Sequence, residues 1–366
     1  MKKNLILFYP SFERGGVEKI IENIIIKNKK FNLHIISSKN INSVVNLKKN
    51  KAKFYPVIYN KSIPFIPQRF LSAFSAMKTL SNAIDKIKGR IVIHSMQSNI
   101  AALLICLLKK KKIIIRNSEN PIYSSINSEN KIIAFFVTIL KFFFYSFADG
   151  VITNSKGSAK SLSFFIFNKK KIKHIYNPYL QSINKQKFKK DKLIINIGRL
   201  RKQKDHKNLL LAFKLFLEKN RDYKLLILGD GNLKQNLKEF SKKLEISKKV
   251  KFKGWVKNTI PYLKKSKIFV LSSSYEGLGN VLIDAINYNV PCVSTNCPSG
   301  PSEILLNGQG GFLVKTKSPE LLADAMNISI RNYTLSLKKN NLAKKKLDRF
   351  LISKNIKDYL NYLNNF

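Results

Sequence analysis

The stretch from Lys267 to Glu303 reads KIFVLSSSYEGLGNVLIDAINYNVPCVSTNCPSGPSE, and the interpretation of the rest of the chain depends on it. Ile268 to Leu271 is a short apolar run, which is typical of a buried parallel strand. Apolar residues then recur at helical spacing from position 281, and Gly277 and Gly279 lie between these two patterns. The stretch therefore predicts a strand, a glycine turn and a helix, in that order.

The predicted turn has the features of an anion site. A helix that begins near Asn280 directs backbone N–H groups and the positive end of its dipole into the turn. Gly279 lets a ligand approach the backbone closely, while Glu276 precedes the turn and Asp284 follows it within the helix. A phosphate cradle between two carboxylates, which can accept hydrogen bonds from sugar hydroxyls, fits a nucleoside diphosphate sugar. An ordinary strand-to-helix turn with a surface glutamate is the alternative.

An acid, seven residues and a second acid around a glycine turn resemble the signature of family-four retaining glycosyltransferases. The resemblance implies that Glu276, which we expect to face solvent, touches the donor sugar and that Asp284 binds the ribose. This family usually has Glu at the second position, and Asp is one methylene shorter. The turn amides that would hold the diphosphate belong to Gly277, Leu278, Gly279, Asn280 and Val281.

The resemblance covers nearly the whole chain and implies the α/β arrangement called GT-B. This consists of two Rossmann-like domains that face each other across a cleft, with a C-terminal helix crossing back to the first domain. The expected acceptor domain is 1–180, the expected nucleotide-sugar domain is 181–346, and the returning helix is 347–366. The resemblance also implies retention of anomeric configuration, no cofactor and no metal.

The composition is strongly basic, with 68 Lys and Arg against 21 Asp and Glu, a net charge of +47. Such a charge suggests nucleic acid or an anionic membrane as a partner. The lysines are spread along the chain instead of forming one stripe, and codons rich in A and T would also supply them. Three cysteines without metal-ligand spacing and a start without a cleavage site predict a cytoplasmic protein.

The first domain contains candidate acceptor residues at predicted strand ends. His94 follows the apolar run 91–93, and ligands of open α/β sheets gather at the carboxyl ends of strands, so we expect a catalytic role for it. A structural histidine is the alternative. Asn99 opens the next helix, and Arg116 and Glu119 lie in a loop that resembles one in enzymes extending lipid-linked oligosaccharides. By the same resemblance, Gly15 and Gly16 line the donor site, although a plain tight turn fits them equally well.

An aromatic stretch from Ile132 to Phe147 is too short for a confident membrane span and predicts a buried or interfacial helix. We expect its Phe142 to Phe144 face, beside Lys141, to contact an anionic leaflet, with packing in the core as the alternative. Contact with a bilayer would make the protein peripheral on the inner face of the cytoplasmic membrane.

The second domain opens with a strand at 193–197, followed by Gly198, Arg199 and, in the same loop, Lys204. In the family, a Gly-Arg followed by a Lys at this place neutralises the leaving diphosphate, which requires two fixed positive charges. Gly229 ends the next strand in another glycine turn, and we expect Gly198 and Gly229 to lie near the donor. Trp255 follows a later strand, where it would flank the base or serve in packing.

These features predict a retaining glycosyltransferase that moves a hexosamine or hexose from a UDP-sugar, or a GDP-sugar, to a glycan acceptor. Residues 299–303 resemble enzymes that add hexosamine units, and the acceptor is expected to be linked to polyprenyl diphosphate. A basic nucleic-acid-binding protein is one alternative, although no specific nucleic-acid motif accompanies the charge. An epimerase or phosphorylase on the same fold is the other.

Overall fold

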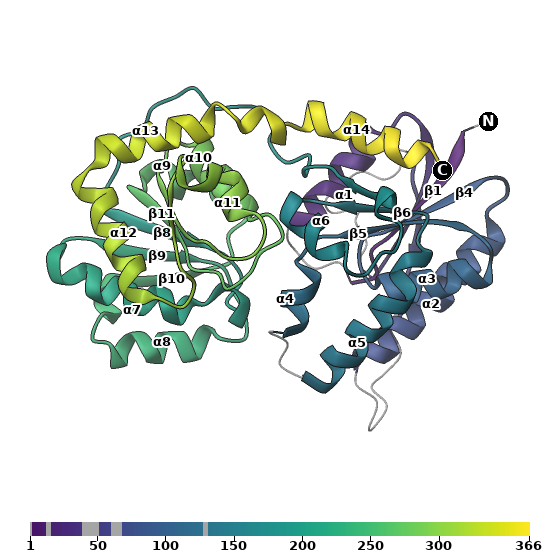
Figure 1. Cartoon of the computed structure of the whole chain (residues 1–366), viewed down its shortest axis with the longest axis horizontal. Coiled ribbons are helices and arrows are strands. Elements are labelled where there is room, and N and C mark those ends of the chain that lie inside the picture. Colours follow the sequence, from purple (N-terminus) through teal and green to yellow (C-terminus); the bar gives the residue numbers. More distant parts are fainter. Residues whose placement is uncertain (1, 12–15, 39–50, 60–67, 127–130) are drawn as a thin grey trace. The chain divides into compact units, whose positions relative to one another are not determined.

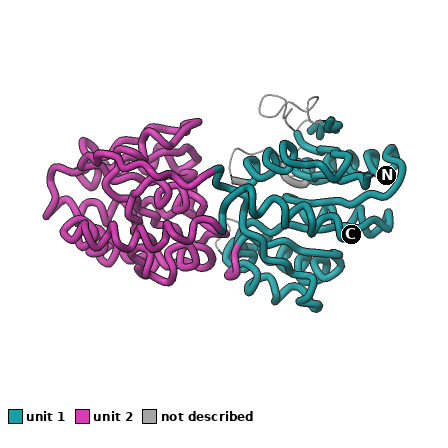
Figure 2. Tube along the Cα trace, turned by 90° about the horizontal axis from the view of Figure 1, so that it is seen from above, with its two compact units in different colours: residues 1–154, 158–181, 349–366 teal, residues 155–157, 182–348 magenta. Residues whose placement is uncertain are grey.

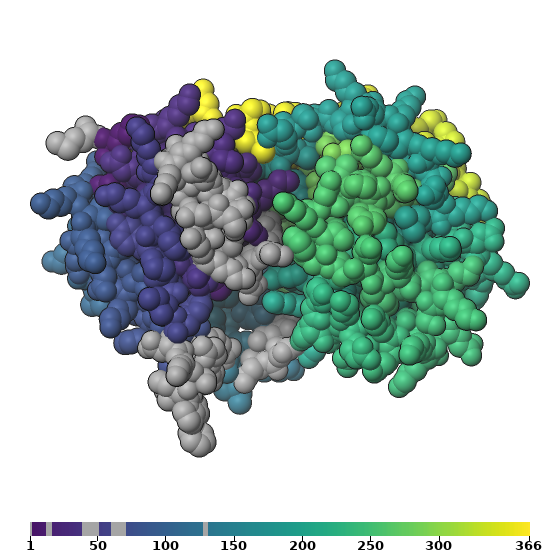
Figure 3. All heavy atoms as spheres, turned by 180° about the vertical axis from the view of Figure 1, so that it is seen from behind, coloured from purple at the N-terminus to yellow at the C-terminus, as the bar shows by residue number. Residues whose placement is uncertain are grey.

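The computed structural model describes residues 2–11, 16–38, 51–59, 68–126 and 131–366, and the other residues are grey in Figures 1, 2 and 3. The chain divides into two compact units, coloured separately in Figure 2. Unit 1 comprises residues 1–154, 158–181 and 349–366, and unit 2 comprises residues 155–157 and 182–348. The last part of the chain therefore belongs to unit 1, as expected for a C-terminal helix that crosses back.

Unit 1 is built on a sheet of seven strands in the order β3-β2-β1-β4-β5-β6-β7, and every pairing is parallel. Its strands are β1 Lys3–Phe8, β2 Phe31–Ser37, β3 Lys53–Pro56, β4 Ile91–Ser95, β5 Lys112–Asn117, β6 Gly150–Thr153 and β7 Ile172–His174. The helices of this part of the chain are α1 Gly16–Lys27, α2 Gln68–Lys86, α3 Asn99–Leu108, α4 Pro121–Ile126, α5 Lys131–Phe144, α6 Lys156–Leu162 and α14 Ile352–Asn364.

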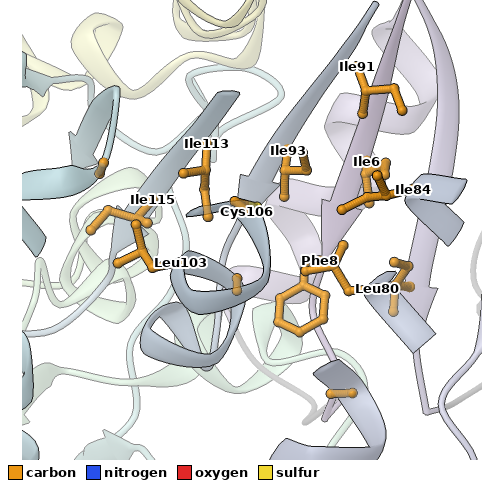
Figure 4. Close-up of a cluster of buried hydrophobic side chains, with 14 of the residues drawn as sticks. Ile6, Phe8, Leu80, Ile84, Ile91, Ile93, Leu103, Cys106, Ile113 and Ile115 are labelled. Carbon is orange, nitrogen blue, oxygen red and sulfur yellow. The ribbon is translucent and has the colours of Figure 1, made fainter. Parts of the chain in front are cut away.

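Both faces of this sheet are covered. Apolar residues of α2 and α3 pack on one face, and Figure 4 shows Leu80, Leu103 and Cys106 against strand residues such as Phe8 and Ile93. Apolar residues of α1 and α14 make the core on the other face. Since parallel sheets are stable only when helices cover both faces, α14 completes a core that the first part of the chain leaves open.

Unit 2 has a sheet of six parallel strands in the order β10-β9-β8-β11-β12-β13. The strands are β8 Leu193–Ile197, β9 Lys224–Leu228, β10 Val250–Gly254, β11 Ile268–Leu271, β12 Cys292–Thr295 and β13 Phe312–Val314. The helices are α7 His206–Lys219, α8 Lys234–Lys243, α9 Ile260–Lys265, α10 Asn280–Asn287, α11 Pro301–Ile304, α12 Pro319–Arg331 and α13 Tyr333–Lys344 (Figure 1).

The strand orders confirm the expected fold class of two Rossmann-like domains. In each sheet the chain starts in the middle, builds outward to one edge and then continues on the other side of its first strand. This reversal makes β1 neighbour β4 in unit 1 and β8 neighbour β11 in unit 2. Loops that leave such a pair diverge, so polar residues after these strands are placed where ligands of doubly wound sheets bind.

Candidate functional site

The loops that follow β8 and β11 are joined by hydrogen bonds. Gln203 Nε2 donates to the carbonyl oxygen of Tyr275 at 3.0 Å, and the amide of Ser274 donates to the carbonyl of Gln203 at 2.8 Å. The hydroxyl of Ser272 donates to the carbonyl of Lys204, also at 2.8 Å. These bonds hold the two loops side by side, so the side chain of Lys204 contacts the residues that follow β11.

An ion pair results from this arrangement. Lys204 Nζ lies 2.5 Å from Glu276 Oε1, and Ser273 Oγ donates to the same oxygen at 2.7 Å. The sequence placed each residue in a loop after a strand, and the structure shows that these two strands, β8 and β11, are neighbours. The expectation that Glu276 faces solvent was wrong, since this residue is only 5% exposed. The side chain of Lys204 is 14% exposed. Glu276 is buried because its backbone also binds the loop after β12, where its N–H donates to the carbonyl of Pro298.

The predicted glycine turn lies directly after this ion pair. Gly277, Leu278 and Gly279 are buried, and Gly279 adopts a φ of 85° just before α10 begins at Asn280. This left-handed conformation costs glycine little, and no side chain caps the helix with a hydrogen bond. The positive end of the α10 dipole therefore points into the turn, as the sequence predicted. Both Val281 and Asp284 are half-buried on α10.

Gly198 and Gly229 have a packing function in the structure. The amide of Gly198 donates to the carbonyl of Leu228, and a Cβ at Gly229 would overlap the carbonyl of Gly198. The loops after β8 and β9 thus require glycine for their close approach. A Cβ on Gly198 would lie 3.4 Å from the Lys204 side chain, an ordinary contact, so the lysine packs directly over this glycine. Arg199 is half-buried beside them, whereas its basic neighbours Arg201 and Lys202 are exposed.

His94 does not lie in an open acceptor loop, which corrects the sequence prediction. It is inside β4 and fully buried, and both ring nitrogens are engaged. Nδ1 lies 3.1 Å from the carbonyl oxygen of Ile114 and so carries the proton, which leaves Nε2 to accept from the Tyr359 hydroxyl at 2.7 Å. Burial lowers the pKa of His94 to about 3, against a weaker opposing effect of the Ile114 hydrogen bond. A neutral histidine bonded to α14 is a structural group.

Arg116 and Asn99 are likewise part of the interior of unit 1. Arg116 is the last residue but one of β5, and it bonds Asn177 Oδ1 at 2.6 Å as well as the hydroxyl of Ser118. Burial lowers the pKa of Arg116, while the neighbouring Tyr359 raises it. Asn99 Nδ2 donates to the Arg116 carbonyl at 3.0 Å. Both were predicted to meet the acceptor, Arg116 from a loop and Asn99 from the start of a helix, and the structure instead buries both.

The remaining predicted residues have simpler positions. Glu119 is exposed after β5, and Trp255 is exposed after β10. Gly16 is the first residue of α1, and Gly15 lies outside the described residues.

An exposed aromatic surface lies on unit 1. Its residues come from α5 and from the segments that follow α5 and α6. The ring centroids of Phe142 and Phe167 lie 5.9 Å apart. We call this set the aromatic surface: Ile132, Phe135, Phe136, Leu140, Phe142, Phe143, Phe147, Phe164 and Phe167. Phe144 is not part of it, because its side chain packs against the core, which corrects the predicted face of 142–144. Lys141 turns inward toward Pro121 and Ser125.

Sequence reasoning missed Ser273, Gln203 and Tyr359. Three consecutive serines after an apolar strand, Ser272 to Ser274, were a usable signal for the first, since small hydroxyl residues at a strand end can orient a nearby side chain. Nothing near His94 or Arg116 in the sequence points to Tyr359, which is 265 residues from His94.

Two features are absent from the described residues. These residues contain no group of three or more His, Cys, Asp or Glu side chains that could hold a metal ion. Nor does any helix among them have the length and apolar character needed to cross a membrane.

Comparison with known proteins gives a consistent match. Residues 180–346 match the family described as glycosyl transferases group 1. An uncharacterized glycosyltransferase of Methanocaldococcus jannaschii is 33% identical over 270 residues, which span 65% of this chain and 66% of that protein. The N-acetylgalactosamine-N,N'-diacetylbacillosaminyl-diphospho-undecaprenol 4-alpha-N-acetylgalactosaminyltransferase of Campylobacter jejuni is 27% identical over 377 residues, 99% of each chain.

Solved structures share the fold. HepE of Anabaena, crystallised with UDP and glucose, has a TM-score of 0.79 at 16% identity, and each chain covers 100% of the other. TarM of S. aureus, solved in a complex that includes UDP, has a TM-score of 0.68 at 18% identity, over 79% of this chain and 59% of TarM. These neighbours have the GT-B fold, so the fold that the sequence predicted is confirmed.

Proposed function

We propose that the chain, a glycosyltransferase of GT-B fold whose residues 180–346 match the glycosyl transferases group 1 family, moves a hexosamine or hexose from a UDP-sugar to a lipid-linked sugar acceptor. The transfer retains the anomeric configuration and takes place in the assembly of a cell-surface glycan. The observation that carries this proposal is the Lys204–Glu276 ion pair beside the glycine turn and the N-terminus of α10.

The donor site follows from this arrangement. The diphosphate lies at the turn of 277–279, where the α10 dipole favours an anion. Lys204 and Arg199 balance the negative charge that grows on the leaving diphosphate, and Glu276 accepts from sugar hydroxyls. Asp284 on α10 binds the ribose. These two cations would do the work that a bound metal does elsewhere, so the proposed reaction is independent of metal and needs no cofactor.

Support for the substrates comes from the named relatives. The Campylobacter jejuni transferase is named for an acceptor on diphospho-undecaprenol, and HepE was crystallised with UDP and glucose. We extend both features to this chain, with a UDP-sugar as the donor and a polyprenyl-diphosphate-linked glycan as the acceptor.

The aromatic surface fits an acceptor that resides in a membrane. Exposed phenylalanines on an amphipathic helix insert at the boundary between headgroups and acyl chains. Exposed lysines flank the surface, with Lys131 at the start of α5 and Lys169 and Lys170 after Phe167. Cations next to an apolar surface favour an anionic leaflet. We therefore propose a peripheral location on the inner face of the cytoplasmic membrane.

A thermal-shift screen of UDP- and GDP-sugars tests the donor, since a ligand that binds only the folded state raises its melting temperature. The hit is then incubated with a polyprenyl-diphosphate-linked acceptor, with and without EDTA, and the anomeric configuration of the product is read by NMR. We expect a UDP-hexosamine or UDP-hexose to bind and a product with the donor's configuration in both samples. Absence of any nucleotide-sugar binding, together with oligonucleotide binding that persists at high salt, would contradict the proposal.

A further inference from the structure

One oxygen of Glu276 receives both side-chain hydrogen bonds that reach this residue from the described part of the chain. Lys204 Nζ and Ser273 Oγ both donate to Oε1, at 2.5 and 2.7 Å. A carboxylate has about four lone-pair sites, so Oε2 can accept from a ligand while Oε1 remains occupied. Lysine has three N–H donors and a flexible stem, so Lys204 can also turn to another acceptor.

The two assigned roles conflict in this geometry. Lys204 is assigned to the donor diphosphate, yet its ammonium group is already paired with Glu276 and largely shielded from water. An arriving diphosphate competes with the carboxylate for the same cation, and it carries the larger charge. The carboxylate, in turn, repels the diphosphate at short range, and this repulsion is strong where water is excluded.

Ser273 is held independently of Lys204. It is fully buried, and Thr295 Oγ1, on the adjacent strand β12, donates to its carbonyl at 2.6 Å. The backbone of Ser273 is therefore held in place, and its hydroxyl remains within reach of Glu276 whether or not the lysine moves.

On the basis of the proposed function, we infer that the Lys204–Glu276 ion pair restrains binding of the donor diphosphate. When Lys204 pairs with the diphosphate instead of Glu276, the hydrogen bond from Ser273 keeps the released Glu276 carboxylate in position for the sugar. Glu276 thus weakens binding of the nucleotide part of the donor and strengthens binding of the sugar part. Ser273 is a positioning residue that acts through Glu276.

This arrangement separates nucleotide affinity from turnover. Glu276→Gln removes the negative charge and releases Lys204, so it should bind UDP about 3- to 10-fold more tightly than the unsubstituted protein, although it transfers less sugar. Ser273→Ala removes a hydrogen bond to a charged group, so kcat should fall by about 10- to 100-fold. Its affinity for UDP should stay within about two-fold, because the diphosphate does not meet Ser273.

Ser274→Ala is the matched control. It removes the same group from the next residue, whose hydroxyl bonds Asp205 at the start of α7 instead of Glu276. We expect its UDP affinity and kcat to match those of the unsubstituted protein.

The experiment measures UDP binding by titration calorimetry, release of UDP from the donor selected in the thermal-shift screen, and the melting temperature of each variant. Absence of UDP binding to the unsubstituted protein would overturn the proposed function and this inference together. UDP binding to the unsubstituted protein with equal or weaker binding to Glu276→Gln would overturn only the restraint. An unchanged kcat in Ser273→Ala, or an equal loss of kcat and UDP affinity with a lower melting temperature, would overturn the positioning role.

Discussion

Polar residues at strand ends have different partners in the two units. In unit 1, His94 and Arg116 are bonded within the unit, in part to Tyr359 of α14. In unit 2, Lys204 and Glu276 are paired beside a glycine turn and a helix N-terminus, and Glu276 Oε2 can accept a further bond. The same fold thus uses one set of strand-end residues to attach a helix, whereas the other set forms the donor site that we propose.

The difference shows that a strand-end position alone does not identify a functional residue. The strand order reverses between β1 and β4 in unit 1 and between β8 and β11 in unit 2, so His94 on β4 lies as close to such a reversal as Lys204 and Glu276 do. What distinguishes unit 2 is a pair of opposite charges from different loops next to a glycine turn at a helix N-terminus. In unit 1, a returning helix supplies the partner that a ligand would otherwise supply.

The largest expected effect is on transfer at the ion pair. Glu276→Gln should retain the fold and lose turnover by about 10³-fold, because the carboxylate that positions the sugar is gone. Steady-state transfer rates and a far-UV circular dichroism spectrum check this. Full activity in the variant would show that Glu276 is not part of the site. Glu276 would then be a structural group, as His94 is.

Arg199→Ala and Lys204→Ala should each lower kcat by about 10²- to 10³-fold, since a fixed cation aimed at developing charge acts mainly on turnover. Arg201→Ala and Lys202→Ala are the controls, because these residues have the same charge, lie in the same loop and are exposed. Kinetics at two ionic strengths distinguish position from bulk charge. Equal losses at all four positions would show that the loop is only part of a basic surface.

In unit 1 the expected effect is on stability. Tyr359→Phe removes the hydroxyl bonded to buried His94 and should lower the free energy of unfolding by about 1–3 kcal/mol. UDP binding, which depends on unit 2, should be unchanged. Trp255 is the single tryptophan and lies in unit 2, so its fluorescence follows that unit while circular dichroism follows both. Equal shifts in both signals would mean that the units unfold together, and weaker UDP binding would contradict a purely structural role.

Acid should weaken both units through buried histidines. Burial lowers the pKa of His94 in unit 1 and of His206 in unit 2 to about 3, well below their ordinary value of 6.5. The unfolded chain therefore binds more protons than the folded one between these values, and stability is present above pH 6.5 and lost as pH falls toward 3. Urea unfolding at pH 7 and pH 5 should show the decrease. A flat profile would mean that water reaches these rings.

The smallest effect concerns the aromatic surface. Replacing Phe142 and Phe143 with serine should reduce binding to anionic liposomes by about ten-fold while leaving the melting temperature nearly unchanged, because both side chains are exposed. Phe144→Ser is the contrasting variant, since Phe144 packs on the core and its loss should lower stability instead. Liposome flotation measures the first effect, and unchanged flotation of a folded double variant would reject membrane contact.

Much of the fold could be predicted from sequence because strands such as 31–37 and 193–197 are apolar runs that end at turn residues. The positions of Lys204 and Glu276 after strands could also be predicted, but their pairing could not, because it depends on β8 and β11 being neighbours in the sheet. The burial of His94 and Arg116 could not, because it depends on Tyr359, a partner that joins the core only after the chain returns. Likewise, the burial of Glu276 depends on the loop after β12, which no local pattern predicted.

The return of α14 has a consequence for synthesis. Unit 2 is nearly continuous in sequence, whereas unit 1 needs residues 349–366, which a ribosome makes after all of unit 2. Domains generally fold as units during translation, so we expect unit 2 to become protease-resistant on a nascent chain arrested before residue 349. Unit 1 should remain sensitive until residues 349–366 are available, because the α1 face of its sheet lacks its last helix. Limited proteolysis of arrested chains would reveal the reversed order, in which unit 1 begins before unit 2 but is completed after it.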